Sequence, residues 1–287
     1  MIIAVVNNKG GTGKTTTSVN LGAAFVQLGY STLVVDLDPQ ASASISLGFT
    51  SSTLTPSMSN VLFDGMGIKS AIRHSPIPNL DIVTADTELY NTDCVFADLE
   101  NRENQLMAAL SSIENEYSFI ICDCPPAFSL VSVNALVAAD AYVVPVTPDY
   151  LALEDLSCMM GLVNELSENM SIDASLLGIV VVMTPTGPTM LSAKSRVAKE
   201  NIGMLRNHFT EDVFLTEINM DVKLAEAPAY GTTIFGSAPG SRGARQYMAL
   251  AQELIDRCGI LKLKTESKRI ARMRNEEHQR GRTGLTL

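Results

Sequence analysis

Short apolar runs alternate with longer segments of mixed polarity along most of the chain. Six runs are rich in β-branched and other apolar residues: IIAVVN, STLVVDLD, LDIVTA, YSFIICD, AYVVPVTP and LLGIVVVM. Helical periodicity predicts helices at about 14–28, 102–114, 130–139, 153–168 and 191–208. Because apolar residues are continuous within the short runs, both faces of these strands are expected to be buried. The pattern predicts an α/β fold, a doubly wound, mostly parallel β-sheet flanked by helices.

The alternation of strands and helices predicts a single domain over residues 1–258. No internal repeat or Pro- or Gly-rich linker divides it, and the polar stretch TSSTLTPSMSN at 50–60 is predicted to be a mobile loop within the domain. Beyond that domain the apolar stripe is lost, and residues 259–287 are predicted to form a basic tail, partly helical or disordered.

Charge is distributed unevenly between these two parts. The whole chain has a net charge of −10, while residues 262–282 contain eight basic and three acidic residues. That segment therefore has a charge of +5, which leaves −15 for the remainder. An acidic body argues against a protein coated in nucleic acid, and the basic tail is a separate candidate for anionic partners.

The composition favours a cytoplasmic globular protein. The apolar runs are too short to span a bilayer, and no basic leader precedes the first one. The five cysteines are an odd number within apolar stretches, so we expect reduced core residues. Cys122 and Cys124 form a C-x-C, but they alternate along a predicted buried strand and no second pair has ligand spacing, which disfavours metal.

The sequence KGGTGKTT joins the first predicted strand to the first predicted helix. Its three glycines, Gly10, Gly11 and Gly13, would let backbone N–H groups approach an anion, which the helix N-terminus also attracts. Lys14 would reach the β- and γ-phosphates of a nucleotide, and the Thr15 hydroxyl would ligate Mg²⁺. The usual phosphate-loop pattern has glycine where this chain has Asn8, and Lys9 is one lysine more than the pattern needs.

Three aspartates follow predicted strands at their carboxyl ends. Asp36 and Asp38 lie in LVVDLDPQA, and Asp123 ends the apolar run in FIICDCPPA. Magnesium and an attacking water need acidic residues close to the phosphates. One such aspartate alone could simply cap the next turn, but three beside a phosphate loop favour a magnesium site.

These motifs resemble those of the deviant Walker ATPases of the ParA/Soj and MinD group. The resemblance rests on KGGTGKTT, DLDPQA and DCPPA, and the stretch DVKLAEAPAYGTTIFGSAPGSRGARQYMALAQEL at 221–254 is similar to ParA/Soj partition ATPases in particular. It covers residues 1 to about 258 and implies a P-loop NTPase that hydrolyses ATP slowly with Mg²⁺. It also implies a homodimer that sandwiches two ATP molecules.

The resemblance assigns roles to residues around the loop. Lys9 would cross to the nucleotide phosphates of the opposite subunit, like an arginine finger in trans; a solvated lysine beside an anion site is the alternative. Asp38 would position or activate the attacking water, while Asp36 and Asp123 would support magnesium with Thr15. With Lys9 and Asp38, Lys14 completes the catalytic candidates. The phosphate-binding candidates are Lys9, Gly10, Gly11, Thr12, Gly13, Lys14, Thr15 and Thr16.

The expected adenine contacts depart from the family pattern. ParA/Soj proteins usually have I-P-x-N-V-[KR]-L near the base, and this chain has INMDVKL, which places Asn219 and Asp221 on the proline and asparagine positions. Both can hydrogen-bond a base edge. An aspartate that accepts from the adenine amino group would favour ATP over GTP.

A DNA-binding member of this group needs basic residues on one face of its dimer. The candidates are Lys194, Arg196, Lys199, Lys223, Arg242 and Arg245. Lys223 falls on a position that is basic in ParA/Soj proteins and is used there for DNA. Any one of them could instead be an ordinary solvated side chain.

Two alternatives share the phosphate loop. A MinD-like membrane ATPase would end in an amphipathic helix, but the tail offers only Ile270 and Met273 before its final leucines. An iron–sulfur reductase would need two cluster cysteines per subunit, for which Cys94 and Cys124 are the pair to consider.

The sequence therefore predicts a nucleoid-associated switch that binds non-specific double-stranded DNA as an Mg-ATP dimer. A ParB-like or cargo-adaptor protein with a basic segment would stimulate hydrolysis, and the acidic body is complementary to such a segment. The cargo stays open among a plasmid, a chromosome region, a chemotaxis cluster and a microcompartment.

Overall fold

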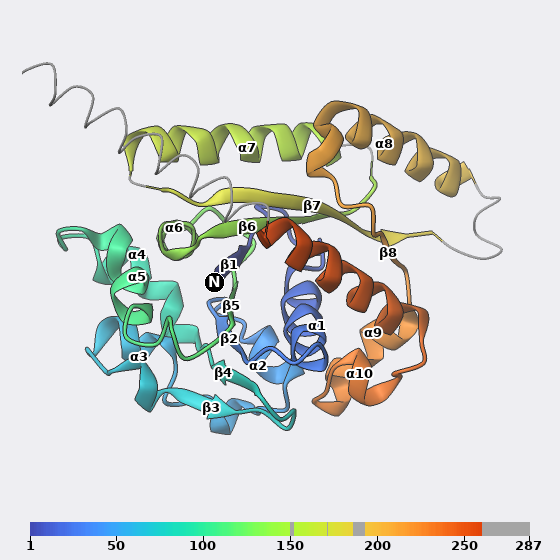
Figure 1. Cartoon of the computed structure of the whole chain (residues 1–287). Helices are drawn as coiled ribbons and strands as arrows, with labels where there is room; N and C mark the ends of the chain where they lie inside the picture. The colour runs from blue at the N-terminus through green and yellow to red at the C-terminus, as the bar shows by residue number, and fades with distance from the viewer. Residues whose placement is uncertain (150–151, 171, 186–192, 260–287) are drawn as a thin grey trace, which may run out of the picture.

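The computed structural model describes residues 1–149, 152–170, 172–185 and 193–259. These residues form a sheet in the order β3-β4-β2-β5-β1-β6-β7-β8, with helices on both faces (Figure 1). Among the described strands, β3 runs antiparallel to β4 and all the other pairs are parallel. The prediction of a mostly parallel sheet flanked by helices is confirmed.

The six predicted apolar runs are all strands. They are β1 (Ile2–Val5), β2 (Thr32–Asp36), β4 (Leu80–Val83), β5 (Phe119–Asp123), β6 (Ala141–Val146) and β7 (Ser175–Thr184). Two further strands at the edges of the sheet were not predicted, β3 (Ile72–His74) and β8 (Ile218–Asn219). With three and two residues, they are too short to show a period in the sequence.

Helices cover both faces of the sheet (Figure 1). One face packs against α1 (Lys14–Gln27), α2 (Ser42–Ser46), α9 (Val222–Glu226), α10 (Ile234–Ser237) and a final helix at 242–259. The other face carries α3 (Met58–Phe63), α4 (Thr92–Val95), α5 (Gln105–Leu110), α6 (Leu130–Ala138), α7 (Ala152–Asn169) and α8 (Ala193–Phe209). Single 3₁₀ turns are η1 (Ser51–Thr53), η2 (Ile68–Ser70), η3 (Thr87–Asn91), η4 (Arg102–Asn104), η6 (Thr210–Asp212) and η7 (Ala227–Tyr230).

The central strand β1 shows why its sequence is apolar throughout. Ile3 and Val5 face the cluster that contains α1, whereas Ala4 and Val6 face the cluster that contains α6. All four are buried, since their exposed fraction is at most 2%. A strand with helices on both sides has no solvent face on which polar residues could alternate.

The segment at 50–60, predicted to be a loop, contains ordered turns. η1 begins it, and its last residues start α3, whose N-cap is Ser57. The Ser57 side chain accepts from the Ser59 backbone N–H, and Asn60 completes the capping box. Residues 50–57 are therefore a loop with one 3₁₀ turn, as predicted, and that this loop is mobile stays a prediction. Only the last three residues of the stretch are helical, because Ser and Asn supply a helix start here as readily as a turn.

The helix predicted at 102–114 is shorter than expected and begins as the 3₁₀ turn η4. Asn134 of α6 accounts for this, because its amide donates to the Arg102 carbonyl at 2.9 Å and accepts from the Leu106 N–H at 3.1 Å. α5 then ends at Leu110. A contact from a distant helix thus sets the local conformation.

The predicted basic tail lies outside the described residues from position 260 onward, so a domain boundary near 258 stays a prediction. Among the residues that are described, no helix combines the length and apolarity required to cross a lipid bilayer.

Candidate functional site

The glycine-rich loop lies at the centre of the sheet's carboxyl edge. It follows β1, which is paired on either side with β5 and β6, and it leads directly into α1. Gly11 and Gly13 have φ of 73° and 74°, a left-handed conformation that side chains disfavour. The backbone of the loop therefore depends on glycine at these two positions.

A cavity of about 490 Å³ opens above this loop. The predicted phosphate-binding residues that line it are Gly10, Gly11, Thr12, Gly13, Lys14, Thr15 and Thr16. Asp38 lines the same cavity from the loop after β2. The structure thus brings together the predicted phosphate loop and the predicted water-positioning carboxylate.

Lys14 is held inside the loop. Its side-chain amine donates to the Lys9 carbonyl at 2.9 Å, and the residue is buried, with 6% exposed. Burial lowers the pKa of Lys14, and the nearby carboxylates of Asp123 and Asp38 act in the opposite direction. A buried cation whose hydrogen bonds go to a main-chain carbonyl is available to exchange that contact for phosphate.

Lys9 points to a different place from Lys14. Its amine donates to Asp149 at 2.9 Å and to Asp155 at 3.1 Å, and these contacts, with Asp149 the larger, raise its pKa. The three side chains are between 37% and 44% exposed. Lys9 does not line the phosphate cavity of its own protomer, so the structure does not place it with the other phosphate-binding candidates.

Asp36 and Asp123 are fully buried neighbours on the paired strands β2 and β5. Asp123 accepts from the hydroxyls of Thr15 and Ser18, both at 2.8 Å. Asp36 accepts from the Ser44 N–H at 2.8 Å and from its hydroxyl at 2.7 Å. Burial, reinforced for Asp36 by the charge of Asp123, raises the pKa of both carboxyls. Thr15 and Asp123, predicted together as magnesium residues, are in direct contact.

Asp38 has a different environment from Asp36, although only one residue separates them. Its backbone N–H donates to Asp36 at 3.2 Å, and its own carboxylate accepts from the Gln40 N–H at 2.9 Å. β2 ends at Asp36, whose side chain lies in the core, whereas Asp38 belongs to the loop that follows and lies at the wall of the cavity. Of the two, Asp38 can meet a water beside the phosphates.

A second cavity, of about 160 Å³, adjoins Gly13 and Thr16. Its wall is mainly apolar, and it includes both predicted adenine residues, Asn219 and Asp221. Each has partners within the protein, however. The side-chain oxygen Oδ1 of Asn219 accepts from the Gln246 side chain at 2.6 Å, and its side-chain nitrogen Nδ2 donates to the Thr184 hydroxyl.

Asp221 accepts two backbone hydrogen bonds from its own protein. Its carboxylate oxygens take the N–H groups of Lys223 and Gly243, each at 3.0 Å, so it caps α9 and ties α9 to the final helix. Both residues are at the cavity, and their direct contact with a base stays a prediction.

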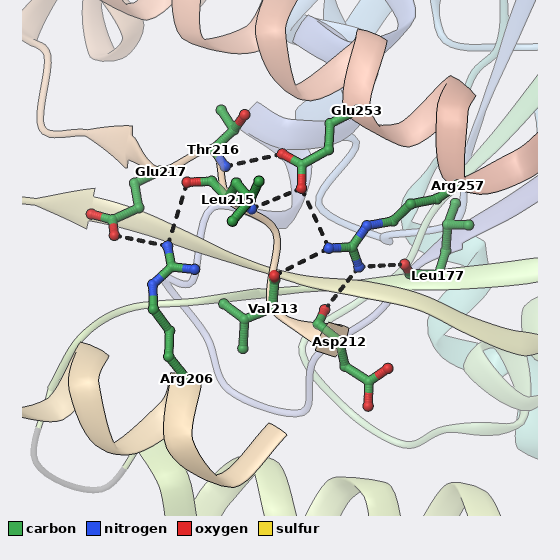
Figure 2. A network of polar contacts seen from close by, with 9 residues as sticks. All are labelled: Leu177, Arg206, Asp212, Val213, Leu215, Thr216, Glu217, Glu253 and Arg257. Atoms are coloured by element: carbon green, nitrogen blue, oxygen red, sulfur yellow. Dashed lines mark hydrogen bonds and ion pairs between the residues drawn. The ribbon is translucent and has the colours of Figure 1, made fainter. Parts of the chain in front are cut away.

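The final helix fixes residues 212–216, which directly precede the segment that lines this second cavity (Figure 2). Glu253 accepts from the backbone N–H groups of Leu215 and Thr216, at 2.7 and 3.0 Å. Arg257 lies over the Phe214 ring at 4.1 Å from its centroid. The guanidinium also donates to three carbonyls, those of Leu177, Asp212 and Val213, at 3.0–3.1 Å. Side chains of the last described helix therefore hold the stretch that leads into residues 218–221 of the cavity wall.

The basic DNA candidates fall into two groups on opposite faces of the sheet. Arg196 and Lys199 are exposed on α8, while the Lys194 side chain lies outside the described residues. Lys223, Arg242 and Arg245 are exposed on α9 and the final helix, near the Asp221 link. Figure 1 shows α8 above the sheet and α9 below it. Lys223 is paired with Glu226 at 2.8 Å.

The cysteines are only partly core residues. Cys122, Cys124 and Cys258 are buried, as predicted, but Cys94 and Cys158 are exposed and the prediction was wrong for them. Cys94 lies on α4 and Cys158 on α7, each on the exposed side of its helix, where a small apolar residue does not need to face the core.

Sequence reasoning missed several residues of the site. Asp149 and Asp155, which hold Lys9, follow the end of β6, and the same rule that selected Asp38 would have found Asp149. Tyr247 lines the second cavity and Gln246 donates to Asn219 in its wall, and both belong to a helix whose pattern shows only its apolar face.

A glycine loop between a central strand and a helix, with a buried lysine and paired buried aspartates behind it, defines a P-loop nucleoside triphosphatase. A family model described as an AAA domain matches residues 1–176. The chain belongs to the ParA/Soj family, within the ParA/MinD superfamily of these proteins.

Two curated relatives match over nearly their whole length. The sporulation initiation inhibitor protein Soj of Bacillus subtilis is 36% identical over 253 residues, which are 88% of this chain and 97% of Soj. The chromosome partitioning protein ParA of Myxococcus xanthus is 32% identical over 256 residues, 89% of this chain and 88% of that protein.

Solved structures share the fold. The McdA(D38A)–ATP complex of Cyanothece superposes with a TM-score of 0.79 at 20% identity, over 89% of this chain and 96% of that one. The septum site-determining protein MinD of Pyrococcus horikoshii, complexed with Mg-ADP, has a TM-score of 0.69 at 25% identity, over 91% of this chain and 98% of that one.

Proposed function

We propose that this chain is a ParA-type positioning ATPase that dimerises around Mg-ATP and then binds non-specific double-stranded DNA. Hydrolysis, stimulated by a ParB-like or cargo-adaptor protein, releases it. Repeated binding and release on the nucleoid, in the cytoplasm, would move or space a DNA or protein cargo. The observation that carries the proposal is the different position of two lysines of one loop. Lys14 lies in the phosphate cavity, and Lys9 is paired with Asp149 and Asp155 outside it.

The cavity fits the phosphates of a nucleoside triphosphate. Residues at the start of α1, with the Lys14 amine and the Thr15 and Thr16 hydroxyls, line this cavity. Asn8, which replaces the usual glycine, has a buried side-chain oxygen without a hydrogen-bond partner among the described residues. The solved relatives that contain ADP or an ATP analogue with magnesium support ATP as the ligand.

The same site fits Mg²⁺. In nucleotide sites this ion is usually held by one or two carboxylates or hydroxyls together with phosphate oxygens and waters. Thr15 would hold it here, with Asp123 and Asp36 behind, and the bound ion would neutralise negative charge on the phosphates. Two buried carboxylates at the carboxyl edge of the sheet are a donor set of the required kind.

Hydrolysis needs a water held in line with the terminal phosphate. Asp38 is the carboxylate at the cavity wall, and its oxygen Oδ1 is fixed by the Gln40 N–H. Its second oxygen would accept from a water and take its proton. We assign Asp38 the positioning of that water, and Lys14 the stabilisation of charge on the phosphate oxygens.

Lys9 is placed to act on a second protomer. Because it is outside its own phosphate cavity, its charge adds little to that site, yet it lies at the mouth of the loop where a facing protomer would approach. Partly exposed ion pairs such as those of Lys9 contribute about 0–1 kcal/mol. The phosphates of a partner's nucleotide, with several negative charges, would readily replace Asp149 and Asp155.

DNA binding is supported by the exposed arginines and lysines on both sides of the β8 edge. Each protomer has a strongly acidic body, so isolated basic groups are weak sites. A dimer doubles the number of basic groups, and affinity for DNA phosphates increases steeply with their number. Affinity for DNA would therefore follow ATP-dependent dimerisation.

Gel shifts with an arbitrary DNA duplex test this function. We expect retention with Mg-ATP and none without nucleotide, because only the dimer presents enough basic groups. Lys223→Ala should weaken binding uniformly across sequences and reduce the salt slope by about one. Lys69→Ala is the matched control, since Lys69 is also an exposed lysine paired with a glutamate. Equal retention without ATP, or flotation with vesicles in the absence of any DNA shift, would contradict the proposal.

A further inference from the structure

Four large apolar side chains are exposed on the segment from η3 to α5. They are Tyr90, Val95, Leu99 and Met107, with 62%, 50%, 44% and 45% exposed. In Figure 1 this segment lies at the left of the molecule, remote from α8, α9 and the final helix. We call residues 86–107 the acidic apolar surface. Exposed apolar side chains gathered on one short segment are typical of a binding surface.

The charge of this segment is predominantly negative. Residues 86–105 contain six acidic residues and one basic residue, a net charge of −5. Of the acidic residues, Glu88, Asp93, Asp98 and Glu100 are exposed. Such a surface repels DNA and anionic lipid, whose phosphates are negative, and attracts cations.

The segment also contacts the loop that follows β2 and the first residue of α6. The Tyr90 hydroxyl accepts a hydrogen bond from the Gln40 side chain, and the Gln40 N–H in turn donates to Asp38 at 2.9 Å. Asp93 accepts from the N–H of Leu130, the first residue of α6, at 3.3 Å. A ligand on this surface would therefore be one side chain away from Gln40, whose backbone orients the water-positioning carboxylate.

We propose that the acidic apolar surface binds a basic, amphipathic segment of a partner protein, and that Tyr90 transmits this binding through Gln40 to Asp38. This inference rests on the proposed function, for which it supplies the site of the stimulating partner. Apolar side chains of the segment would cover Val95 and Leu99, while its lysines and arginines would meet the surrounding carboxylates. Tyr90 is a positioning residue, since it acts on Asp38 through another residue.

A designed helical peptide, with leucines on one face and lysines and arginines on the other, is the probe. We expect it to bind the full-length protein, to lose affinity as salt increases, and to accelerate ATP turnover. The same peptide with glutamate in place of its basic residues should do neither. Absence of binding by the basic peptide would overturn the proposal.

Leucine variants locate the binding site. Leu99→Asp should lower peptide affinity about tenfold or more. Leu162→Asp is the matched control on α7, because Leu162 is a leucine of similar exposure, 38% against 44%. Basal turnover and ATP-dependent dimerisation should be unchanged in both variants, which separates a failure here from a failure of the proposed function. Equal effects of the two substitutions on peptide binding would overturn the assignment.

A third variant separates binding from stimulation. Tyr90→Phe removes the hydroxyl that contacts Gln40 and keeps the ring, so peptide affinity should stay the same while the stimulation of kcat is lost. A full-length variant in which Arg269, Arg272 and Arg274 are changed to glutamine should bind the peptide with the same affinity as the native chain. Tighter binding by that variant would show that this chain's own tail competes for the surface, and it would overturn the assignment to a partner.

Discussion

Lys9 and Lys14 lie five positions apart in one loop and have opposite environments. Lys14 is buried, and desolvation lowers its pKa, so its charge is costly until an anion arrives. Lys9 is paired with Asp149 and Asp155, which raise its pKa. Lys14 thus lies in the phosphate cavity of its own chain, whereas Lys9 lies outside that cavity, paired with carboxylates.

Replacement of the buried lysine tests the phosphate site. Lys14→Ala should reduce ATP affinity by about 10- to 100-fold, because it removes a charge-assisted hydrogen bond to phosphate. Isothermal titration with a non-hydrolysable ATP analogue measures the change, and the exposed Lys69→Ala should have native affinity. Undiminished binding by Lys14→Ala would contradict the assignment of the loop.

Replacement of the cavity-wall carboxylate tests the hydrolytic role. Asp38→Ala should lower the rate of ATP turnover by at least about 10²-fold, in the range usual for a lost general base, while leaving ATP-dependent dimerisation intact. Single-turnover phosphate release and light scattering measure the two properties. The exposed Asp64→Ala is the control. Turnover at the native rate would remove Asp38 from this role.

At the residue scale, the sequence predicted groups whose chemistry is local. Gly13, Lys14 and Thr15 are adjacent, so their pattern alone indicates a phosphate cradle, and the structure places them around one cavity. The partners of Lys9 are 140 and 146 residues away, and no local pattern pairs them with Lys9. The hydrogen bonds of Asn219 and Asp221 likewise come from a distant helix.

At the scale of elements, burial determined what could be predicted. The six strands covered on both faces are continuous apolar runs, and all six were found. β3 and β8 are short edge strands with polar residues, and their pairing follows from neighbours already in the sheet. The 3₁₀ start of the 102–110 region depends on Asn134, which is remote in sequence.

The final helix is held in place largely by the side chain of Arg257, so a single substitution tests its contacts. Arg257→Ala leaves three carbonyls without their donor and removes the contact with Phe214, so we expect the free energy of unfolding to fall by about 2–4 kcal/mol. Urea titration measures it.

Arg206→Ala is the comparison for that substitution. Arg206 is partly exposed and makes one ion pair, with Glu217 at 3.0 Å, besides a 3.4 Å contact to the Leu215 carbonyl (Figure 2). Its loss should cost about 1 kcal/mol or less. An Arg257→Ala protein as stable as Arg206→Ala would show that the helix is not held in the way described.

For the whole molecule, the distribution of function follows the sheet. The phosphate loop, Asp38 and the ion pairs of Lys9 with Asp149 and Asp155 lie at the carboxyl edge of the central strands, where the loops of a parallel sheet meet. The acidic apolar surface flanks this edge on one side, and the basic candidates lie toward β8 on the other. A protomer that faces a second copy across the phosphate loops would leave both surfaces available to partners.

Light scattering of the native and Lys9→Ala proteins, with and without an ATP analogue, tests whether Lys9 joins two copies of the chain. We expect the native chain to change from monomer to dimer when the analogue binds, and Lys9→Ala to bind the analogue with similar affinity yet stay monomeric. A native chain with the same mass in both conditions, or a Lys9→Ala protein that dimerises as well as the native one, would contradict this role of Lys9.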